Sequence, residues 1–482
     1  MNSGLLSIAR SALVAHQTAL QTIAQNVANA ETPGYSRQEA VLAPNTPLRM
    51  PYGNVGTGIN VSTVVRKRDL LLDESFRTAN GQAGDAGMRR DLMQELEAVF
   101  GEPSDAGMSN ALDQFWNAWS DLSAQPSSLA ARAVVQQRGR QVGQLFNGYD
   151  TQLTTLRTST IERLGNTVER ISALATQVAD LNGRIVSAES SGNSANDLRD
   201  LRDLKLDELS KLAGARALQQ PDGSVSVLIG NSTLVDGATS VSVSMQLETP
   251  NPLPATPLTD LPVRIQLGNP PDRLFPLAGE LGAMATVVNS EIPDVRTRLD
   301  AMASQLVSAV NTAHSGGFTF NGSAIPGVAA GNFFDAGTMA VPVSAATLKL
   351  HSTILADPSR IAASGNASAP TDNTVAQALS ALRTAENTVS FSTPTGATET
   401  GSFVGFFRGL VTRVGLQTAS ANDEATVATT LADQADLRRQ AVSGVSTDEE
   451  LVRMLRAQQS FQAAAKMIKV AEEMLDTLVN LV

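Results

Sequence analysis

The stretch that decides the fold is the C-terminal segment, whose residues 443–482 read SGVSTDEELVRMLRAQQSFQAAAKMIKVAEEMLDTLVNLV. Mostly apolar residues return at alternating steps of three and four, which places one narrow stripe along a helix that packs against another helix. The stripe consists of Leu451, Met454, Gln458, Phe461, Ala465, Ile468, Glu472, Leu475, Val479 and Val482. The sequence therefore predicts one helix over residues 447–482, roughly 54 Å long at about 1.5 Å per residue.

The beginning of the chain carries the same spacing. Its stripe consists of Leu6, Ala9, Leu13, His16, Leu20, Ile23 and Val27. Because neither stripe is satisfied within its own helix, the two helices must pack on each other, on the body of the protein or on other molecules. Antiparallel ends that lie side by side would bury each other, and the apolar surface that remains exposed would be available for polymerisation.

Composition excludes several classes of protein. The 482 residues are enough for about two to four domains, and the net charge is -11 with scattered basic residues, which argues against a nucleic-acid partner. No cysteine is present, so disulfides and thiolate sites are excluded. No stretch reaches the roughly 18 to 20 apolar residues of a membrane span, and residues 1–30 lack a secretory signal. We expect no membrane insertion, and either a cytoplasmic location or export without signal cleavage.

We expect a mainly helical protein with a β-rich insertion. Aromatic residues make up only 4% of the chain, and long helices rich in Ala, Leu and Val are typical of extended rods. The predicted division is an N-terminal helix with an extended segment at residues 1–65, a helical rod at 66–213, a small β-rich outer insertion at 214–282, a second part of the rod with mixed strands at 283–442, and the C-terminal helix at 443–482.

Local patterns predict individual elements. Residues 130–212 contain almost no proline and predict a long helical hairpin, in which the Asp and Arg side chains of residues 197–212 pair along a solvated helix. The run Thr32-Pro33-Gly34-Tyr35 has the order of a type II turn. Thr447 and Glu450 have the spacing of a capping box. We also expect a helix over residues 373–389 and a loop over 392–401.

The sequence gives little support for catalysis. The motifs H-E-x-x-H, G-x-x-x-x-G-K-[ST] and G-x-S-x-G are absent, and the three histidines lie far apart. We interpret His314 as a hydrogen-bonding residue at a helix end and His16 as an interface residue. Trp116 and Trp119, three residues apart, are expected in a helical core. We therefore predict no enzyme, and no catalytic, cofactor-binding or metal-binding residue.

Three stretches together resemble a known family. Residues 3–37, which end in ANAETPGYSR, and residues 443–482, which contain SGVSTDEE and QQSFQAAAK, resemble the terminal motifs shared by bacterial flagellar rod, hook and hook-associated proteins. Between them, residues 197–214 and residues 306–334, with LVSAVNTAHSGGFTFNG and GNFFD, resemble the interior of one branch, the hook-associated protein 1 family. The resemblance is weakest at residues 224–281 and 390–400.

The resemblance implies a structural adaptor of the extracellular bacterial flagellum that joins the hook to the filament. In that family the terminal helices form an inner coiled coil of a tubular polymer, with a ring of about eleven subunits. The implied partners are the hook protein, the second hook-associated protein and a cytoplasmic export chaperone that covers the C-terminal helix. Export through a type III machine implies a cytoplasmic location before assembly.

The residues expected at the assembly interface belong to the two stripes and the turn after the first helix. They are Leu6, Leu13, Leu20, Ile23, Val27, Asn29, Thr32, Pro33, Gly34, Tyr35, Leu451, Met454, Phe461, Ile468, Leu475 and Val482. The residues expected to contact the chaperone are Leu455, Phe461, Ile468 and Leu475.

Other functions stay open at this point. The chain would also suit another flagellar axial protein of the hook or distal rod type, although the long helical interior argues against hook proteins, whose interiors are mainly β. An adhesin or a cell-wall hydrolase carried on such ends is a further alternative. A hydrolase would need a compact acidic or histidine site in the middle of the chain, and the sequence shows none.

Overall fold

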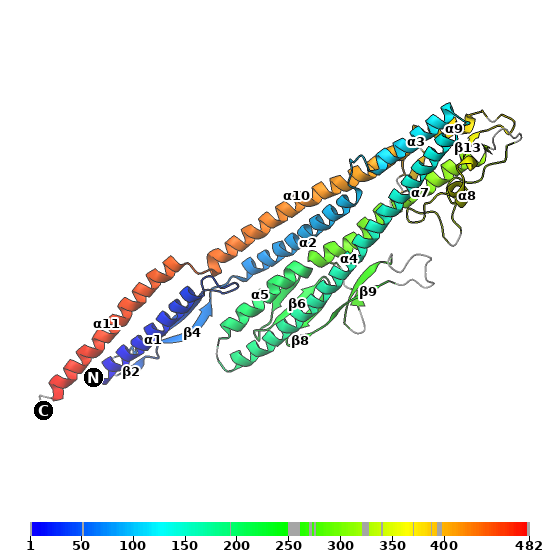
Figure 1. Cartoon of the computed structure of the whole chain (residues 1–482). Helices are drawn as coiled ribbons and strands as arrows, with labels where there is room; N and C mark the ends of the chain where they lie inside the picture. Colours follow the sequence, from blue (N-terminus) through cyan, green and yellow to red (C-terminus); the bar gives the residue numbers. More distant parts are fainter. Residues whose placement is uncertain are drawn as a thin grey trace.

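The computed structural model is an elongated molecule whose two chain ends lie together at its narrow end (Figure 1). It describes residues 2–50, 53–192, 194–248, 261–268, 272–273, 276–320, 327–338, 341–369, 371–386, 388–392 and 398–479. Helix α1 (Asn2–Ala28) and helix α11 (Thr447–Val479) run antiparallel to each other at this end. We call these two helices the axial pair.

A β-hairpin supports the first helix of the axial pair. Strand β1 (Gln38–Pro44) pairs antiparallel with β4 (Ile59–Arg66), and the short strands β2 (Leu48–Met50) and β3 (Gly53–Val55) pair between them. Both long strands pack on α1, whereas α11 packs chiefly on α1 among the described elements. Helix α1 is therefore covered on two sides, and α11 is covered on one.

Long helices build the rod that follows. Helix α2 (Leu70–Phe100) lies along α10 (Phe403–Ser443), and α4 (Leu129–Ser190) lies along α5 (Asn196–Ala213). Helix α6 (Gly279–Thr286), a π-helical turn (Val287–Glu291) and α7 (Ile292–Ser315) form one continuous helical stretch. The buried apolar residues of the rod helices form a single core that extends along the rod. The prediction of a mainly helical protein with paired terminal helices is confirmed.

Capping residues explain where the rod helices begin and end. Asp69 accepts hydrogen bonds from the backbone N–H groups of Leu71 and Leu72 at the start of α2, and Ser128 caps α4 in the same way. Helices α2 and α5 end at Gly101 and Gly214, both in the left-handed conformation that glycine adopts without strain.

An aromatic cluster forms the core of the wide end. Phe115, Trp116 and Trp119 of α3 (Met108–Ala124) are buried, and the Trp119 ring lies 5.4 Å from the Phe333 ring. The Asn311 side chain accepts hydrogen bonds from the backbone N–H groups of Phe333 and Phe334, which fixes this loop on α7. The two tryptophans are core residues, as predicted.

The β-rich insertion consists of two small antiparallel sheets beside α4. One has the order β5 (Arg216–Gln219), β6 (Val225–Ile229), β7 (Ser232–Asp236) and β8 (Thr239–Ser240), and the other contains β9 (Val243–Leu247), β10 (Val263–Leu267) and β11 (Asp272–Arg273). Asn182 of α4 binds the first sheet through the backbone of Val225 and Gly237. The predicted presence of a β-rich insertion in a mainly helical chain is confirmed.

Short elements complete the wide end. They are β12 (Phe318–Thr319), α8 (Ser352–Ala356), a 3-10 turn (Pro358–Arg360), β13 (Ala362–Ser364), α9 (Thr374–Ala381), β14 (Val389–Ser392) and β15 (Thr398–Gly401). The prediction of a helix over residues 373–389 was wrong beyond Ala381, and the predicted loop at 392–401 contains a strand that pairs with β14. Val389 and Phe391 are buried in alternation with exposed serines, which is a strand pattern.

Glycines allow α2 to approach the end of α5 closely, and this contact gives a first prediction. A Cβ atom at Gly84 would collide with the carbonyl oxygen of Lys211. We expect Gly84→Ala to lower the free energy of unfolding by about 1 to 3 kcal/mol, because the backbones must separate. Gly87→Ala on the same helix is the matched control, since a Cβ there meets no atom within 4 Å. It should stabilise the protein by roughly 0.5 to 1 kcal/mol in urea unfolding. Equal changes in the free energy of unfolding of the two variants would contradict the close packing of α2 against the end of α5.

Candidate assembly interface

The seam of α11 follows a seven-residue repeat of large and small side chains. Met454, Phe461, Ile468 and Leu475 are half-buried, and the alanines seven residues apart, at 457, 464 and 471, lie between them and are buried or half-buried. Because α11 packs chiefly on α1, this buried side marks the face that contacts α1. Alanine at every second seam position favours a close approach of the two helix axes.

The predicted stripe of α11 was therefore wrong at Leu451, Gln458 and Glu472. Leu451 is 50% exposed, and Gln458 and Glu472 are also exposed, whereas Glu450 is fully buried. The prediction chose Leu451 because its side chain is apolar. In the structure the seam passes through Glu450, one residue earlier in the chain. Val482 lies outside the described residues.

The large apolar side chains missing from the seam lie on the opposite side of α11. Leu455 is 59% exposed and Val470 is 53% exposed, while Ala464 and Ala471 on the seam are almost fully buried. We define the free face of α11 as Val452, Leu455, Arg456, Lys466 and Val470, all of which are exposed. A helix that buries alanine and exposes leucine and valine presents a second apolar surface.

The predicted residues of α1 lie in the pair with graded burial. Ile23 is buried, and Leu6, Leu13, Leu20 and Val27 are half-buried. Half-burial in the single chain leaves part of each side chain accessible. His16 is half-buried on the same helix, as expected of an interface residue.

A buried asparagine joins the two ends of the chain where they leave the axial pair. The Asn26 amide donates to Glu450 Oε2 at 2.9 Å and to the carbonyl oxygen of Gln38 at 2.8 Å. Its oxygen accepts from the Tyr35 hydroxyl at 2.8 Å and from the Gln38 N–H at 3.0 Å. All four hydrogen-bonding positions of the side chain are used, so this contact fixes the register of α1 against α11.

The turn after α1 has the predicted geometry. The Tyr35 N–H donates to the Thr32 carbonyl oxygen at 3.2 Å, and Gly34 has a φ of 81°, as a type II turn requires. Thr32, Pro33 and Gly34 are exposed, and Asn29 and Tyr35 are half-buried. Burial, with added repulsion from Asp200, Asp197 and Glu450, raises the pKa of the Tyr35 hydroxyl to about 12. The hydroxyl therefore stays a hydrogen-bond donor.

The start of α11 differs from the predicted capping box. Ser446, one residue earlier than expected, precedes the helix, and its hydroxyl accepts from the Glu449 N–H at 3.5 Å. Glu450 serves Asn26 instead of the helix terminus. Ser446 and Thr447 can both cap a helix, and Glu449 and Glu450 each follow one of them at a spacing of three. The sequence therefore allows two capping boxes, and the predicted pair of Thr447 and Glu450 was wrong.

Buried ion pairs connect the axial pair and its hairpin to the rod. We define the collar as Arg66, Arg68, Arg77 and Arg439 with Asp73, Asp200, Asp203 and Asp207. Asp203 contacts Arg66 at 2.8 Å, Arg77 at 3.2 Å and Arg68 at 3.5 Å. Burial alone raises the pKa of the Asp203 carboxyl, but the guanidinium groups of Arg68, Arg66 and Arg77 outweigh it and lower the pKa to about 2.

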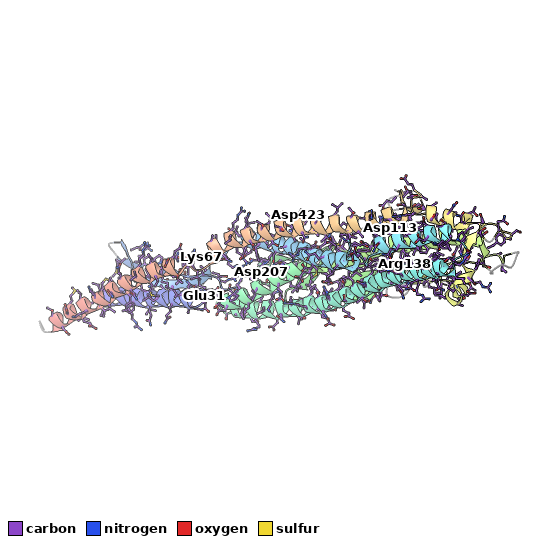
Figure 2. All side chains as sticks on the ribbon, turned by 45° about the horizontal axis from the view of Figure 1, so that its top comes forward. Glu31, Lys67, Asp113, Arg138, Asp207 and Asp423 are labelled. Atoms are coloured by element: carbon purple, nitrogen blue, oxygen red, sulfur yellow. The ribbon has the colours of Figure 1, made fainter. Side chains whose placement is uncertain are left out.

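The collar reaches three separate parts of the chain. Asp200 accepts from the Ser36 hydroxyl at 2.6 Å, just after the turn, and from Arg66 of β4 at 2.6 Å. Arg439 of α10 binds Asp207 at 2.5 Å and lies 3.7 Å from the Phe76 ring. In Figure 2, Glu31 and Lys67 mark the junction and Asp207 lies on the rod side of it. The collar therefore holds the axial pair at a set position on the rod.

The prediction of a solvated helix at residues 197–212 was wrong. Asp200, Arg202 and Asp203 are buried, and the pairs of this collar join α5 to other elements instead of running along one helix. The sequence did contain a signal for these ion pairs. The only compact basic cluster, residues 66–68, and the most regular acidic run, residues 197–207, complement each other.

Comparison with known proteins identifies the family. The family model of the flagellar hook-associated protein FlgK helical domain matches residues 93–334. Flagellar hook-associated protein 1 of Bacillus subtilis strain 168 is 30% identical to this chain, over 98% of this chain and 97% of that protein. The chain belongs to the flagellar hook-associated protein 1 family.

Other similarities agree with membership of the hook-associated protein 1 family. The model named flagella basal body rod protein matches residues 6–35, and the model of the flagellar basal body rod FlgEFG protein C-terminal matches residues 439–481. Flagellar hook-associated protein 1 of Escherichia coli K12 is 25% identical, over 99% of this chain and 100% of that protein. The structure of the flagellar hook junction protein FlgK from Burkholderia pseudomallei shares the fold, with a TM-score of 0.64 at 16% identity over 77% of this chain and 100% of that chain.

Membership of the hook-associated protein 1 family makes this chain a structural protein of the flagellar hook–filament junction that associates with the hook and other flagellar proteins. It also sets aside the alternative of a hook or distal rod protein. Among the described residues, no helix is long and apolar enough to cross a membrane, and no group of three or more His, Cys, Asp or Glu is placed to hold a metal ion.

Proposed function

We propose that this chain is a non-enzymatic adaptor subunit that joins the flagellar hook to the filament by helical polymerisation through its axial pair. The observation that carries the proposal is the free face of α11, which exposes Leu455 and Val470 although alanines occupy every second position of the seam. Exposed apolar stripes of this length are typical of helices that pack against a further helix surface.

The assembly in which this surface acts extends the proposal. We infer neighbours from the hook protein on one side and the second hook-associated protein on the other, in a ring of about eleven copies. This chain acts outside the cell after export, and it is cytoplasmic before export. We also propose the domain limits given above, with residues 1–65 and 443–482 on the inside of the tube and the insertion at 214–282 on its outside.

An export chaperone would bind α11 before it pairs with α1. Of the residues expected to contact the chaperone, Leu455 is exposed, but Phe461, Ile468 and Leu475 are half-buried in the axial pair. A chaperone that contacts all four therefore competes with α1 for α11. This competition keeps the apolar surfaces covered until export.

The shared surface gives a second prediction. We expect Phe461→Ser with Ile468→Ser to weaken both chaperone binding and assembly, because each substitution removes about 1.5 to 3 kcal/mol of burial. Titration calorimetry against the chaperone, together with a motility assay, measures the two effects. Lys466→Glu lies off the seam and is the control for chaperone binding. Chaperone binding at wild-type affinity by the double variant would show that chaperone and α1 use different faces.

Imaging of cells tests the proposed adaptor role. We expect negative-stain images of cells that lack this protein to show hooks without filaments, and expression of the wild-type chain to restore the filaments. Filaments of normal number and length on cells without the protein would overturn the proposal.

A further inference from the structure

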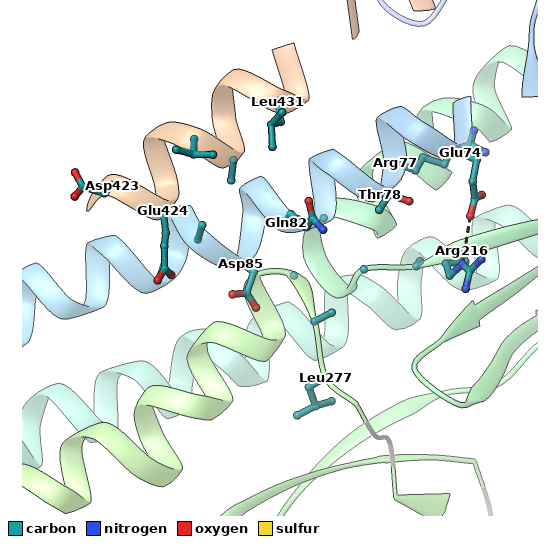
Figure 3. Close-up of a pocket in the computed structure, with 18 residues that line it drawn as sticks. Glu74, Arg77, Thr78, Gln82, Asp85, Arg216, Leu277, Asp423, Glu424 and Leu431 are labelled. Carbon is teal, nitrogen blue, oxygen red and sulfur yellow. Dashed lines mark hydrogen bonds and ion pairs between the residues drawn. The ribbon is translucent and has the colours of Figure 1, made fainter. Parts of the chain in front are cut away.

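A groove of about 880 Å³ opens on the rod between α2 and α10, beside the segments that enter and leave the β-rich insertion (Figure 3). Its apolar lining includes Ala86, Leu277, Val427 and Leu431. Val427 is 59% exposed and Leu431 is 48% exposed, so the groove is open to a partner. The groove lies apart from the axial pair, and Arg77 of the collar forms part of its lining.

Helix α10, like α11, buries small side chains and exposes large apolar ones. Its second half packs on α2 through small buried residues, which are Thr418, Ala421, Ala425 and Ala432. The large apolar residues Leu416, Val427, Leu431 and Leu437 are exposed instead. The part of α10 that borders the groove therefore carries an unpartnered apolar face of the same kind as the free face of α11.

The rim of the groove is acidic. Asp85, Asp423 and Glu424 lie around it, together with Glu74, which is paired with Arg216 at 3.2 Å (Figure 3). Within the described part of the chain, Asp423 and Glu424 have no basic partner within 4.0 Å. Burial raises the pKa of Asp85, against the influence of Arg89, and the Glu424 carboxylate raises it further. A basic partner would relieve this repulsion.

The middle part of helix α11 has the complementary charge. Residues 451–471 contain Arg453, Arg456, Lys466 and Lys469 and no acidic residue, whereas residues 420–436 of α10 contain four acidic residues and no basic one. Helix α1 also lacks acidic residues, so it offers this part of α11 from a neighbouring copy no carboxylate partner. The acidic groove on the rod would attract it.

We propose that the groove between α2 and α10 receives the free face of α11 from a second copy of this chain. Leu455 and Val470 then contact the apolar lining, and Arg456 and Lys466 face Asp423 and Glu424 on the rim. This contact would join the axial pair of one subunit to the rod of its neighbour. The inference rests on the proposed polymerisation and specifies the surface that it uses.

Pairwise cross-linking tests the proposal, because the native chain contains no cysteine. A tagged Leu431→Cys chain and an untagged Val470→Cys chain are expressed together in cells that lack the wild-type protein, and isolated flagella are oxidised. We expect a disulfide-linked dimer of tagged and untagged chains. The matched control pairs Val470→Cys with Val134→Cys, an exposed valine on α4, and should give no dimer. Assembly of both variants without the 431–470 dimer would overturn the inference and leave the proposed polymerisation standing.

A charge exchange covers the case in which a cysteine variant does not assemble. Glu424→Lys should lower the assembled share of the protein by about tenfold, because like charges then meet across the contact. Lys466→Glu added to the same chain should restore most of the loss. Both residues are exposed, so the melting temperature of each variant should equal that of the wild type. A Glu424→Lys variant that assembles normally, or a double variant that shows no rescue, would contradict the groove contact. Failure of the wild-type chain to assemble would instead contradict the proposed function.

Discussion

Replacement of Asp203 by alanine is expected to lower the free energy of unfolding by about 3 to 5 kcal/mol, because it leaves the buried guanidinium groups of the collar without a shared partner. Asp203 is in contact with Arg66, Arg68 and Arg77, all of which are largely buried. Removing the carboxylate brings their positive charges into repulsion at a site with little water. Urea unfolding of the whole chain measures the effect.

Asp180 supplies the control for this prediction. It forms an ion pair with Arg184 at 3.6 Å on the exposed side of α4. Asp180→Ala should change the free energy of unfolding by no more than about 0.5 kcal/mol, since water screens exposed pairs. If the two alanine variants lost equal stability, the collar would contribute no more than a surface pair, and another contact would have to position the axial pair.

Acid is expected to destabilise the wide end of the rod through His314. The ring is buried beside Trp119 and Phe333, its Nδ1 lies 2.7 Å from the Gly331 carbonyl oxygen, and its Nε2 accepts from the Ala362 N–H at 2.9 Å. These contacts need a neutral ring that carries its proton on Nδ1. Burial lowers the pKa of His314 to about 4, with a small opposing effect of the Gly331 hydrogen bond and further lowering by Arg132.

The direction of the pH effect follows from this shift. The ordinary pKa of histidine is 6.5, so the unfolded chain binds the proton between pH 6.5 and 4 while the folded chain does not. The contribution of His314 is complete above pH 6.5 and is lost as the pH falls toward 4, by about 3 kcal/mol in all. His314→Gln removes the titrating group, so urea unfolding near pH 7 and near pH 4.5 should show a smaller acid loss in the variant. The same acid loss in both proteins would contradict this assignment.

The sequence predicted the helical architecture because its strongest signals are local. The proline-poor residues 130–212, the helical periodicity of the two chain ends and the order of Pro33 and Gly34 each describe one segment of chain. The structure confirms the helical hairpin, the two terminal helices and the turn. The role of His314 as a hydrogen-bonding residue was also predictable, because it stands beside Gly316 and Gly317 at a helix end.

The register of α11 was harder to predict for a physical reason. The predicted register puts Leu451, Gln458 and Glu472 on the seam, whereas the observed register puts Glu450, Ala457 and Ala471 there. The hydrophobicity of Leu451 favours the first register. Packing distance favours alanine, because the two helices approach more closely when every second seam position is small. That preference depends on the partner helix and on the buried contact between Asn26 and Glu450, which lie far apart in the sequence.

The collar was missed for a related reason. Asp200, Asp203 and Asp207 have the spacing of a solvated charged helix, and nothing within that helix shows that Arg66 and Arg77 approach from other elements. Long-range charge complementarity is a tertiary property. The short hairpin after α9 was missed in the same way, because its strand signal is only four residues long.

The central claim is that the free face of α11 is an assembly surface. The most direct test is the amount of purified protein that assembles on isolated hooks, compared between two matched pairs of substitutions. Leu455→Ser with Val470→Ser removes the free face, and Leu129→Ser with Val134→Ser removes a leucine and a valine of similar exposure, 53% and 47%, on the rod. All four residues are exposed, so neither pair should change the melting temperature. We expect the α11 pair to reduce assembly by about a hundredfold or more and the α4 pair to assemble like the wild type. Equal assembly of the two variants would contradict the account.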